Sequence, residues 1–472
     1  MSDLHDLTAL EQAAAIRAGE VSSLELTEHY LARIEKFSDT VGAFITVTAD
    51  LAREQARARD IEVRRGELRS PLHGVPVPVK DLNLTAGIRT TFGSTVFSDF
   101  APDVDDHVVS LLRDAGTVLL GKTNTPEMGL PCYTENAIAP PARTPWDLER
   151  MAGGSSGGAA AAVAAGLAPV AHGNDGGGSV RIPASCCGLV GLKPSRGRIS
   201  GGPVKGDVSG LPVEGALART VLDAAALLDV MARPMPGDPH WAPPLPPGET
   251  FAGHAARPPG RLRVGRFAAP VIAEATLHPE VQLAYDEASR LLEALGHEVE
   301  DVDLPVPPSV VPLFETVWSV LSTLAPVDPD REAELQPLTR HLRGRGRAVD
   351  ATTFALAVIG LQGVARHMIA TTASYDVLLS PTLAQPPLPV GAIRNEADPA
   401  RDFEDNKRFT PFTAIYNLTG QPAISLPLHW TDEGLPVGVM LAGRPAGEAG
   451  LLAVAAQLEA AAPWHHRKPP LW

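Results

Sequence analysis

Cysteines are scarce in this chain. Only 3 of its 472 residues are cysteines, Cys132, Cys186 and Cys187. Three cysteines give no disulfide framework, and their spacing matches no metal-binding pattern. Cys186 and Cys187 adjoin Ile182-Pro183-Ala184, and a free cysteine in such a setting usually behaves as a small core hydrophobe. We therefore expect no disulfide framework and no metal centre.

Clusters of positive charge and long apolar runs are also missing. The chain has 40 Lys and Arg against 55 Asp and Glu, a formal net charge of −15 at pH 7. Nucleic acids and anionic membranes are bound mainly through clustered positive charge. No run of 18 apolar residues is present, and residues 1–7 lack the basic and apolar parts of a secretory signal. These absences predict a cytoplasmic protein without a nucleic-acid or membrane partner.

The remaining composition is that of a globular protein, with 44% hydrophobic residues to form a core. Helical patterns alternate with short apolar runs, which indicates an α/β fold with a mixed or parallel sheet. Expected helices are two within 6–36, then 49–66, 103–115, 156–165, 279–295 and 450–459. Expected strands are 75–79, 117–120, 168–171, 262–265, 375–380 and 423–426.

Two segments interrupt this alternation. Residues 234–260 are rich in Pro, Gly and His, which is typical of a linker or a long surface crossing. Residues 306–370 are helical but less regular, and we expect them to form an excursion from the sheet that could serve as a lid or a substrate wall.

One lysine and two serines carry the pattern that most suggests chemistry. Lys80 ends the run Gly74–Lys80, Ser155 lies in Gly153–Gly158, and Ser179 follows Gly176-Gly177-Gly178, 24 residues after Ser155. A serine hydroxyl needs a base to become a nucleophile, and acyl transfer needs donors for the oxyanion. Glycines let backbone N–H groups approach a substrate closely. The pattern predicts a nucleophile with its own oxyanion hole.

Two other motif matches and one acidic cluster have simpler interpretations. Gly116–Thr123 fits a phosphate-binding loop, but its interior is an apolar strand and no helix start follows. Gly153–Gly157 fits the nucleophile elbow of α/β-hydrolases, which stays a minor alternative because it leaves the second glycine–serine element unexplained. Asp103, Asp105 and Asp106 precede an apolar helix, where they favour capping over metal binding.

Taken together, these elements resemble the amidase signature hydrolases. The resemblance runs through nearly the whole chain and is densest over 70–232, which would be the catalytic core of a single domain spanning 1–472. The matching segments are Leu72–Asp81, Gly121–Gly129, Gly153–Gly158, Gly178–Ala184, Gly188–Pro194, Asn417–Ala423 and Gly434–Gly438. The resemblance implies a central twisted mixed sheet flanked by helices on both faces, and a serine hydrolase that needs no cofactor.

The resemblance also implies residue roles. Ser179 would attack the carbonyl carbon, Ser155, preceded by a cis peptide bond, would relay the proton, and a neutral Lys80 would act as base. The backbone amides of Gly176, Gly177, Gly178 and Ser179 would hold the oxyanion. Ser156, Asp175 and Arg181 would support the site, with Asp175 ordering the nucleophile loop and Arg181 pairing with a carboxylate.

The expected pocket and substrate are less specific. Met128, Gly129, Leu130, Pro131 and Tyr133 align with a stretch that lines the acyl pocket in the family, and their apolar content favours a hydrophobic substrate. Similarity to bacterial 6-aminohexanoate cyclic-dimer hydrolases favours alkyl or aryl amides, and carbamates (urethanes) or esters could react similarly. We expect such a small molecule as partner and allow for a homodimer.

The chain departs from the family pattern near Ser179, and two alternative functions are open. The family usually has Ser or Thr before the Asp of the nucleophile loop, whereas this chain has Asn174 before Asp175. Two other functions share the fold: the glutaminase component of a tRNA amidotransferase, and a binding protein without catalysis. The acidic composition argues against the first, and intact Lys80, Ser155 and Ser179 argue against the second.

Overall fold

The computed structural model describes residues 3–472, and their strands form two sheets. A 3-stranded sheet has the order β1-β3-β2, and an 8-stranded mixed sheet has the order β4-β6-β5-β10-β11-β9-β7-β8. The strands of the small sheet are β1 (Phe44–Val47), β2 (Val79–Lys80) and β3 (Gly121–Thr123). The strands of the large sheet are β4 (Val170–Asp175), β5 (Val190–Lys193), β6 (Val213–Ala218), β7 (Arg263–Arg266), β8 (Glu298–Asp301), β9 (Val377–Pro381), β10 (Ala423–Trp430) and β11 (Pro436–Gly443).

The helices surround these sheets. They are α1 (Ala9–Ala18), α2 (Ser23–Val41), α3 (Ala49–Arg65), α4 (His107–Asp114), α5 (Gly157–Ala164), α6 (Arg181–Cys187), α7 (Val221–Met231), α8 (Phe251–Ala255), α9 (Pro279–Ala294), α10 (Val310–Ser322), α11 (Pro337–Arg347), α12 (Ala351–Thr371), α13 (Pro399–Phe409), α14 (Ile415–Thr419) and α15 (Glu448–Ala461).

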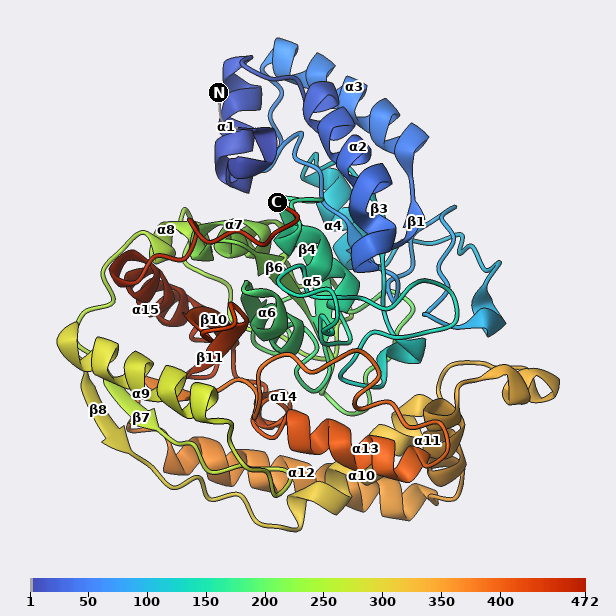
Figure 1. Cartoon of the computed structure of the whole chain (residues 1–472), viewed down its shortest axis with the longest axis vertical. Coiled ribbons are helices and arrows are strands. Elements are labelled where there is room, and N and C mark those ends of the chain that lie inside the picture. Colours follow the sequence, from blue (N-terminus) through green and yellow to red (C-terminus); the bar gives the residue numbers. More distant parts are fainter. Residues whose placement is uncertain (1–2) are drawn as a thin grey trace.

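The large sheet carries helices on both faces, as expected for the fold class. Helices α7, α9 and α15 contact β6, β10 and β11, whereas α5 and α6 contact β4, β5 and β11. Figure 1 shows α5 and α6 near the centre of the molecule, the helices α10 to α13 gathered at one end, and α2 and α3 at the other. The core between these layers is aliphatic, since it consists mainly of Val, Leu and Ala side chains.

Several elements begin where the sequence indicated. Ser22 caps α2 by accepting from the Glu25 N–H, and the Glu25 side chain accepts from the Ser22 N–H, which completes a capping box. The expected strands at 168–171, 262–265, 375–380 and 423–426 correspond to β4, β7, β9 and β10, and β4 continues to Asp175. This extension matters because it delivers the chain directly to the nucleophile loop.

Segments 75–79 and 117–120 pair with each other only irregularly, so the regular strand expected at 117–120 is wrong, whereas the proline-interrupted run 75–79 is the irregular strand that its sequence allows. The two segments run parallel, joined by the Val77 N–H to Val118 C=O bond (2.8 Å) and the Val118 N–H to Val75 C=O bond (3.0 Å). Pro76 and Pro78 have no N–H to donate, so regular pairing begins only at β2, against β3. The strand after the apolar run is therefore Gly121–Thr123.

Of the two interrupting segments, 306–370 is helical as expected, whereas 234–260 is more structured than its composition suggests. Residues 234–260 contain the short helix α8, and residues 306–370 contain α10, α11 and α12. Among the described residues, α12 has the length and apolar composition of a helix that could cross a membrane. This single helix is weak evidence, because it also contacts α10 and α14 within the fold. The absence of a membrane partner stays a prediction.

Candidate active site

Lys80 lies at the end of β2, next to β4 of the large sheet. The Pro78 C=O accepts from the His172 N–H at 3.1 Å, which ties the segment before Lys80 to β4. The Lys80 side chain is fully buried, and its Nζ lies 2.7 Å from Ser155 Oγ. Burial lowers the pKa of Lys80 to about 7, although Glu214 and Asp175 oppose that shift. A lysine with this pKa is partly neutral near pH 7 and can accept a proton.

Ser155 is placed by its backbone. The Gly154–Ser155 peptide bond is cis, as the resemblance implied. A Cβ built on Gly154 would lie 2.7 Å from the carbonyl carbon of Tyr133, so only glycine fits there. The helix α5 begins two residues after Ser155, and the buried Ser156 donates from Oγ to the Asn174 C=O at 3.1 Å. Ser156 thereby connects the turn of Ser155 to the end of β4.

Asp175 organises the loop that carries Ser179. Its carboxylate accepts from the N–H of Gly178 at 2.7 Å and of Val180 at 3.2 Å. Arg181 pairs with both oxygens of this carboxylate, at 3.0 Å from Nε and 2.9 Å from Nη2. Burial alone would raise the pKa of Asp175, but the Arg181 guanidinium outweighs it and holds the pKa well below its usual range. Asp175 is therefore a permanent anion that clamps the loop.

The hydrogen bonds of Asp175 correct the oxyanion-binding role predicted for Gly178. The N–H of Gly178 already donates to Asp175 Oδ1, so it is not free to bind an oxyanion. The N–H groups of Gly176, Gly177 and Ser179 have no hydrogen-bond acceptor within residues 3–472. The sequence could not separate these glycines, because a run of identical residues does not show which N–H the carboxylate takes.

Ser155 and Ser179 are neighbours without being bonded through their side chains. The Ser156 N–H donates to the Ser179 C=O at 3.1 Å, which brings the two serine segments together. Within residues 3–472, no hydrogen bond joins Ser155 Oγ to Ser179 Oγ. The structure thus contains the hydrogen bond between Lys80 Nζ and Ser155 Oγ but none between the two serine hydroxyls.

A pocket opens directly beside Ser179. Its volume is about 750 Å³ with the mouth included, and Ser179 and Gly177 form part of its floor. Leu130 and Pro131 line it as expected. The other lining residues are Cys132, Ile182, Ile272, Val310, Val311, Phe314, Glu315, Trp318, Phe403, Asn406, Lys407, Thr410, Ala414, Ile415 and Leu418.

Three of the residues predicted for this pocket do not line it. Tyr133 is buried, and its hydroxyl donates to Asp402 Oδ2 at 2.8 Å, which turns it away from the cavity. Gly129 lies against Ser155, since a Cβ there would be 3.3 Å from Ser155 Oγ. The Met128 N–H donates to the Phe92 C=O at 2.7 Å, and Met128 adopts a positive φ of 53° within a short turn. The turn directs only the next residues, Leu130 and Pro131, to the cavity.

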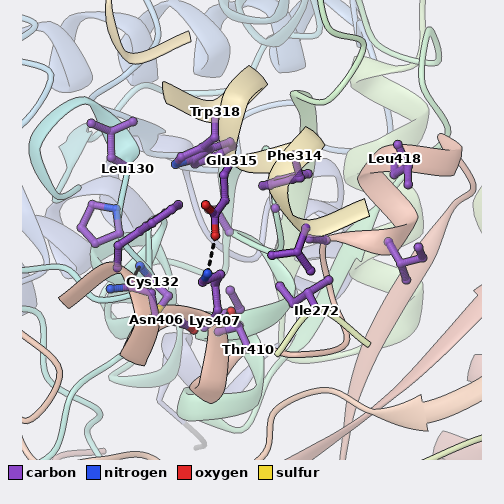
Figure 2. A pocket seen from close by; sticks show the side chains of 18 of the residues that line it. Leu130, Cys132, Ile272, Phe314, Glu315, Trp318, Asn406, Lys407, Thr410 and Leu418 are labelled. Atoms are coloured by element: carbon purple, nitrogen blue, oxygen red, sulfur yellow. Dashed lines mark hydrogen bonds and ion pairs between the residues drawn. The ribbon is translucent and has the colours of Figure 1, made fainter. Parts of the chain in front are cut away.

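Much of the pocket comes from α10 and α13. Helix α10 lies within residues 306–370, which were expected to form a lid or a substrate wall, whereas no motif assigned α13 to the site. Phe314 and Trp318 on α10 stack with ring centroids 5.6 Å apart, and Figure 2 shows them across the cavity from α13. Lys407 on α13 forms an ion pair with Glu315 on α10, drawn as a dashed line in Figure 2. The pattern Phe314-x-x-x-Trp318 has helical spacing, which was the one available signal.

The phosphate-loop match has a structural role. Lys122 is fully buried, and its Nζ donates to the Asn83 C=O at 2.7 Å and to Thr90 Oγ1 at 2.8 Å. Its ammonium also lies 3.4 Å from Asp81 Oδ1. Within residues 3–472, no three His, Cys, Asp or Glu side chains lie close enough together to hold a metal ion.

Comparison with known proteins agrees with this geometry. A family model described as Amidase matches residues 25–452. A 6-aminohexanoate-cyclic-dimer hydrolase of Paenarthrobacter ureafaciens is 38% identical, with 98% of this chain and 96% of that protein covered. A glutamyl-tRNA(Gln) amidotransferase component from Thioalkalivibrio sulfidiphilus is 37% identical, with 99% of each covered. A solved structure of 6-aminohexanoate cyclic dimer hydrolase matches 100% of both chains with a TM-score of 0.91 and 35% identity. The chain therefore belongs to the amidase signature family and is a hydrolase of amide bonds.

Proposed function

We propose that this hydrolase cleaves small uncharged amides through an acyl-enzyme on Ser179, with Ser155 as proton relay and neutral Lys80 as base. The observation that carries the proposal is the 2.7 Å contact between Lys80 Nζ and Ser155 Oγ, made by a fully buried lysine. A general base must lie within hydrogen-bond reach of the proton it takes and have a pKa near the working pH, and Lys80 meets both conditions.

The first half of the reaction forms the acyl-enzyme. Ser179 Oγ attacks the carbonyl carbon while its proton passes to Ser155 Oγ, and the Ser155 proton passes to Lys80 Nζ. The tetrahedral oxyanion is bound by the N–H groups of Gly176, Gly177 and Ser179. Loss of one such donor typically costs about 3–4 kcal/mol of transition-state stabilisation. Ser155 then protonates the leaving nitrogen, the C–N bond breaks, and Lys80 returns its proton to Ser155.

The second half releases the acid. Water takes the place of the amine, gives its proton through Ser155 to Lys80, and attacks the acyl carbon. The collapse of this second intermediate breaks the bond to Ser179 Oγ, which takes the proton back. Hydrogen bonds of catalytic groups are often longer before substrate binds. The bond between Ser155 and Ser179 would therefore form when a carbonyl enters the pocket.

The chemistry of the pocket favours an uncharged, apolar substrate. Its walls are mainly aliphatic and aromatic, and its two charges neutralise each other in the ion pair of Glu315 and Lys407. Glu315 also accepts from Arg345 at 2.9 Å. Burial raises the pKa of Glu315, but these two hydrogen bonds outweigh that effect and keep it ionised. A charged substrate would have to displace one of these partners.

The relatives agree with this substrate class. A cyclic dimer of 6-aminohexanoate, the substrate in the name of one relative, is an apolar amide without free charges. We extend the proposal to alkyl and aryl amides, and to carbamates and esters as secondary substrates, because their carbonyls pass through a comparable tetrahedral species. A cytoplasmic location is expected for such an enzyme.

A substrate panel combined with active-site labelling tests the proposal. Anilides, alkyl amides, esters and carbamates are assayed on the purified protein, and a fluorophosphonate is used to label wild type and Ser179→Ala. We expect hydrolysis of apolar amides, and labelling of wild type on Ser179 alone. Glutamine hydrolysis that appears only with added partner proteins would instead support the amidotransferase function. No labelling and no turnover would support a binding protein.

A further inference from the structure

A chain of two amides, the buried Asn83 and the partly buried Asn174, links Lys80 to two carboxylates behind it. Asn174 Oδ1 lies 2.7 Å from Lys80 Nζ, and Asn174 Nδ2 donates to Asn83 Oδ1 at 3.2 Å. Asn83 Nδ2 in turn donates to Glu214 Oε1 at 3.0 Å and to Asp106 Oδ2 at 3.1 Å. The reaction sequence above assigns no role to these four residues.

The carboxylates fix the direction of this chain. An ionised carboxylate only accepts hydrogen bonds, whereas an amide side chain has one donating and one accepting end. Burial would raise the pKa of Glu214, but the His172 hydrogen bond and its charge outweigh burial, and the pKa falls to about 2. The end of Asn83 that faces Glu214 must therefore be its NH₂ group. Its carbonyl oxygen is left to face Asn174.

The same argument decides the donor and acceptor ends of Asn174, which lies between Asn83 and Lys80. Asn83 Oδ1 can only accept, so Asn174 must present its NH₂ group to Asn83 and its oxygen to Lys80. Lys80 Nζ is then surrounded by Asn174 Oδ1 at 2.7 Å, the Asn174 C=O at 3.5 Å and Ser155 Oγ at 2.7 Å. Both Asn174 oxygens are pure acceptors, and Ser155 alone can donate.

This geometry accounts for every proton of the neutral amine, which has two N–H bonds and one lone pair. The two N–H bonds are directed to the two oxygens of Asn174, and the lone pair is left for the Ser155 hydroxyl. We propose that Asn83 and Asn174 are positioning residues that orient the lone pair of Lys80 toward Ser155, with Glu214 and Asp106 fixing the polarity of the chain. This inference rests on the proposed function, in which Lys80 is the base.

The amide of Asn174 constrains Lys80 in a way that a hydroxyl side chain at the same position would not. A hydroxyl hydrogen rotates, so a hydroxyl can either donate to or accept from an amine. An amide held at both ends cannot exchange its donor and acceptor atoms without breaking two hydrogen bonds. This chain thus uses a rigid element where a hydroxyl would leave the direction open.

Several charged and titratable groups surround Lys80 and must be kept in view in any pH measurement. Glu214 and Asp175 stabilise its ammonium form, and Lys205 destabilises it. The groups behind them are His172, which lies between Glu214 Oε2 and the Lys80 N–H, and Asp106, which is paired with Lys205. A new carboxylate at position 174 would contact Lys80 Nζ directly, which none of these anions does.

The sharpest test is Asn174→Asp, which keeps the shape and replaces the NH₂ group by a second acceptor oxygen. A carboxylate in direct contact with a buried cation shifts a pKa by about 1–3 units. The shift here is upward, because the ammonium is favoured. We expect the acidic limb of the kcat/KM profile to move to higher pH by at least about 1 unit, with at least about fivefold lower activity at pH 7 that recovers on raising the pH.

Asn83→Leu is the second variant, because it leaves Lys80 and Asn174 in place while it removes the fixed polarity, together with the hydrogen bonds that Asn83 donates to Glu214 and Asp106. We expect kcat to fall roughly tenfold with KM unchanged, since the lone pair is less often directed at Ser155. Asn395→Asp, on a partly exposed loop, is the matched control for added charge and should keep the wild-type pH profile. Tm measurements show whether each variant is folded.

The outcomes separate this inference from the proposed function. An Asn174→Asp profile with the acidic limb of wild type, or an Asn83→Leu variant with wild-type kcat, overturns the positioning role. A uniform loss at every pH that follows a fall in Tm would show a structural role only, and also overturns it. Activity that does not depend on Ser179, or no labelling of Ser179, would instead overturn the proposed function.

Discussion

The two sides of the pocket are built on different principles. The catalytic wall (residues 153–158 and 174–181) consists of glycines, serines and a clamped aspartate whose polar groups are bonded to one another. The helical wall (α10 and α13) consists mainly of apolar side chains, with Asn406 and the ion pair of Glu315 and Lys407 as its polar groups. On the first wall, backbone positions define the chemistry. On the second, side chains can change without disturbing any hydrogen bond of the reaction.

The largest effect should come from removing the nucleophile. In Ser179→Ala the catalytic wall keeps its shape but has no oxygen to acylate. We expect kcat to fall by roughly 10⁴-fold or more, as for other serine hydrolases without their nucleophile. Steady-state assays and circular dichroism on the same sample check that activity is lost and the fold retained. Turnover close to that of wild type would remove Ser179 from the site.

Gly178→Ala should come next, because it inserts a methyl group into the catalytic wall. The new Cβ would lie 2.3 Å from Thr413 Oγ1, and the residue has a φ of +135° that side chains rarely adopt. Overpacking costs about 1–3 kcal/mol, so we expect a lower Tm and activity reduced by roughly 10²-fold. Gly201→Ala is the control, since nothing lies within 4 Å of its added Cβ. Equal behaviour of the two variants would contradict the close fit.

The pH dependence is a third way to test this wall. Lys80 works only as the neutral amine, and its pKa is about 7. Below that pH the ammonium form predominates, so kcat/KM should fall tenfold per pH unit, and above it kcat/KM should level off. Profiles measured from about pH 5 to 9 check this. A profile that is flat through pH 7 would mean that Lys80 is not the group that controls the rate.

The smallest effect should follow from Trp318→Ala on the helical wall. Loss of this ring removes apolar contact with the substrate and takes no hydrogen bond from Ser179 or its partners, although the ring also lies close to the backbone of Gly176. We expect KM for bulky aryl amides to rise roughly tenfold, with kcat nearly constant and small amides little affected. Trp241→Ala is a suitable control, because that ring is 63% exposed and outside the pocket. A fall in kcat for every substrate would show that the two walls are coupled.

The same contrast explains how far the sequence could be interpreted. The catalytic wall could be predicted from local motifs, because Lys80, Ser155 and Ser179 stand in short segments whose glycines reveal a close backbone approach. For the helical wall the sequence indicated only that residues 306–370 could form a substrate wall, because the positions of Phe314 and Lys407 beside Ser179 depend on how helices distant in the chain pack together. The expected strand at 117–120 is wrong for another reason. Pro76 and Pro78, which interrupt its hydrogen bonding, lie in the partner segment 75–79 and not in the strand itself.

The proposed base and the proposed nucleophile belong to separate sheets. Lys80 ends β2 of the 3-stranded sheet, while the loop of Ser179 follows β4 of the 8-stranded sheet. Neither sheet alone holds a complete reactive centre. In the proposed mechanism, hydrolysis therefore requires the two sheets to be docked, and local opening of the smaller sheet would switch it off without unfolding the larger one.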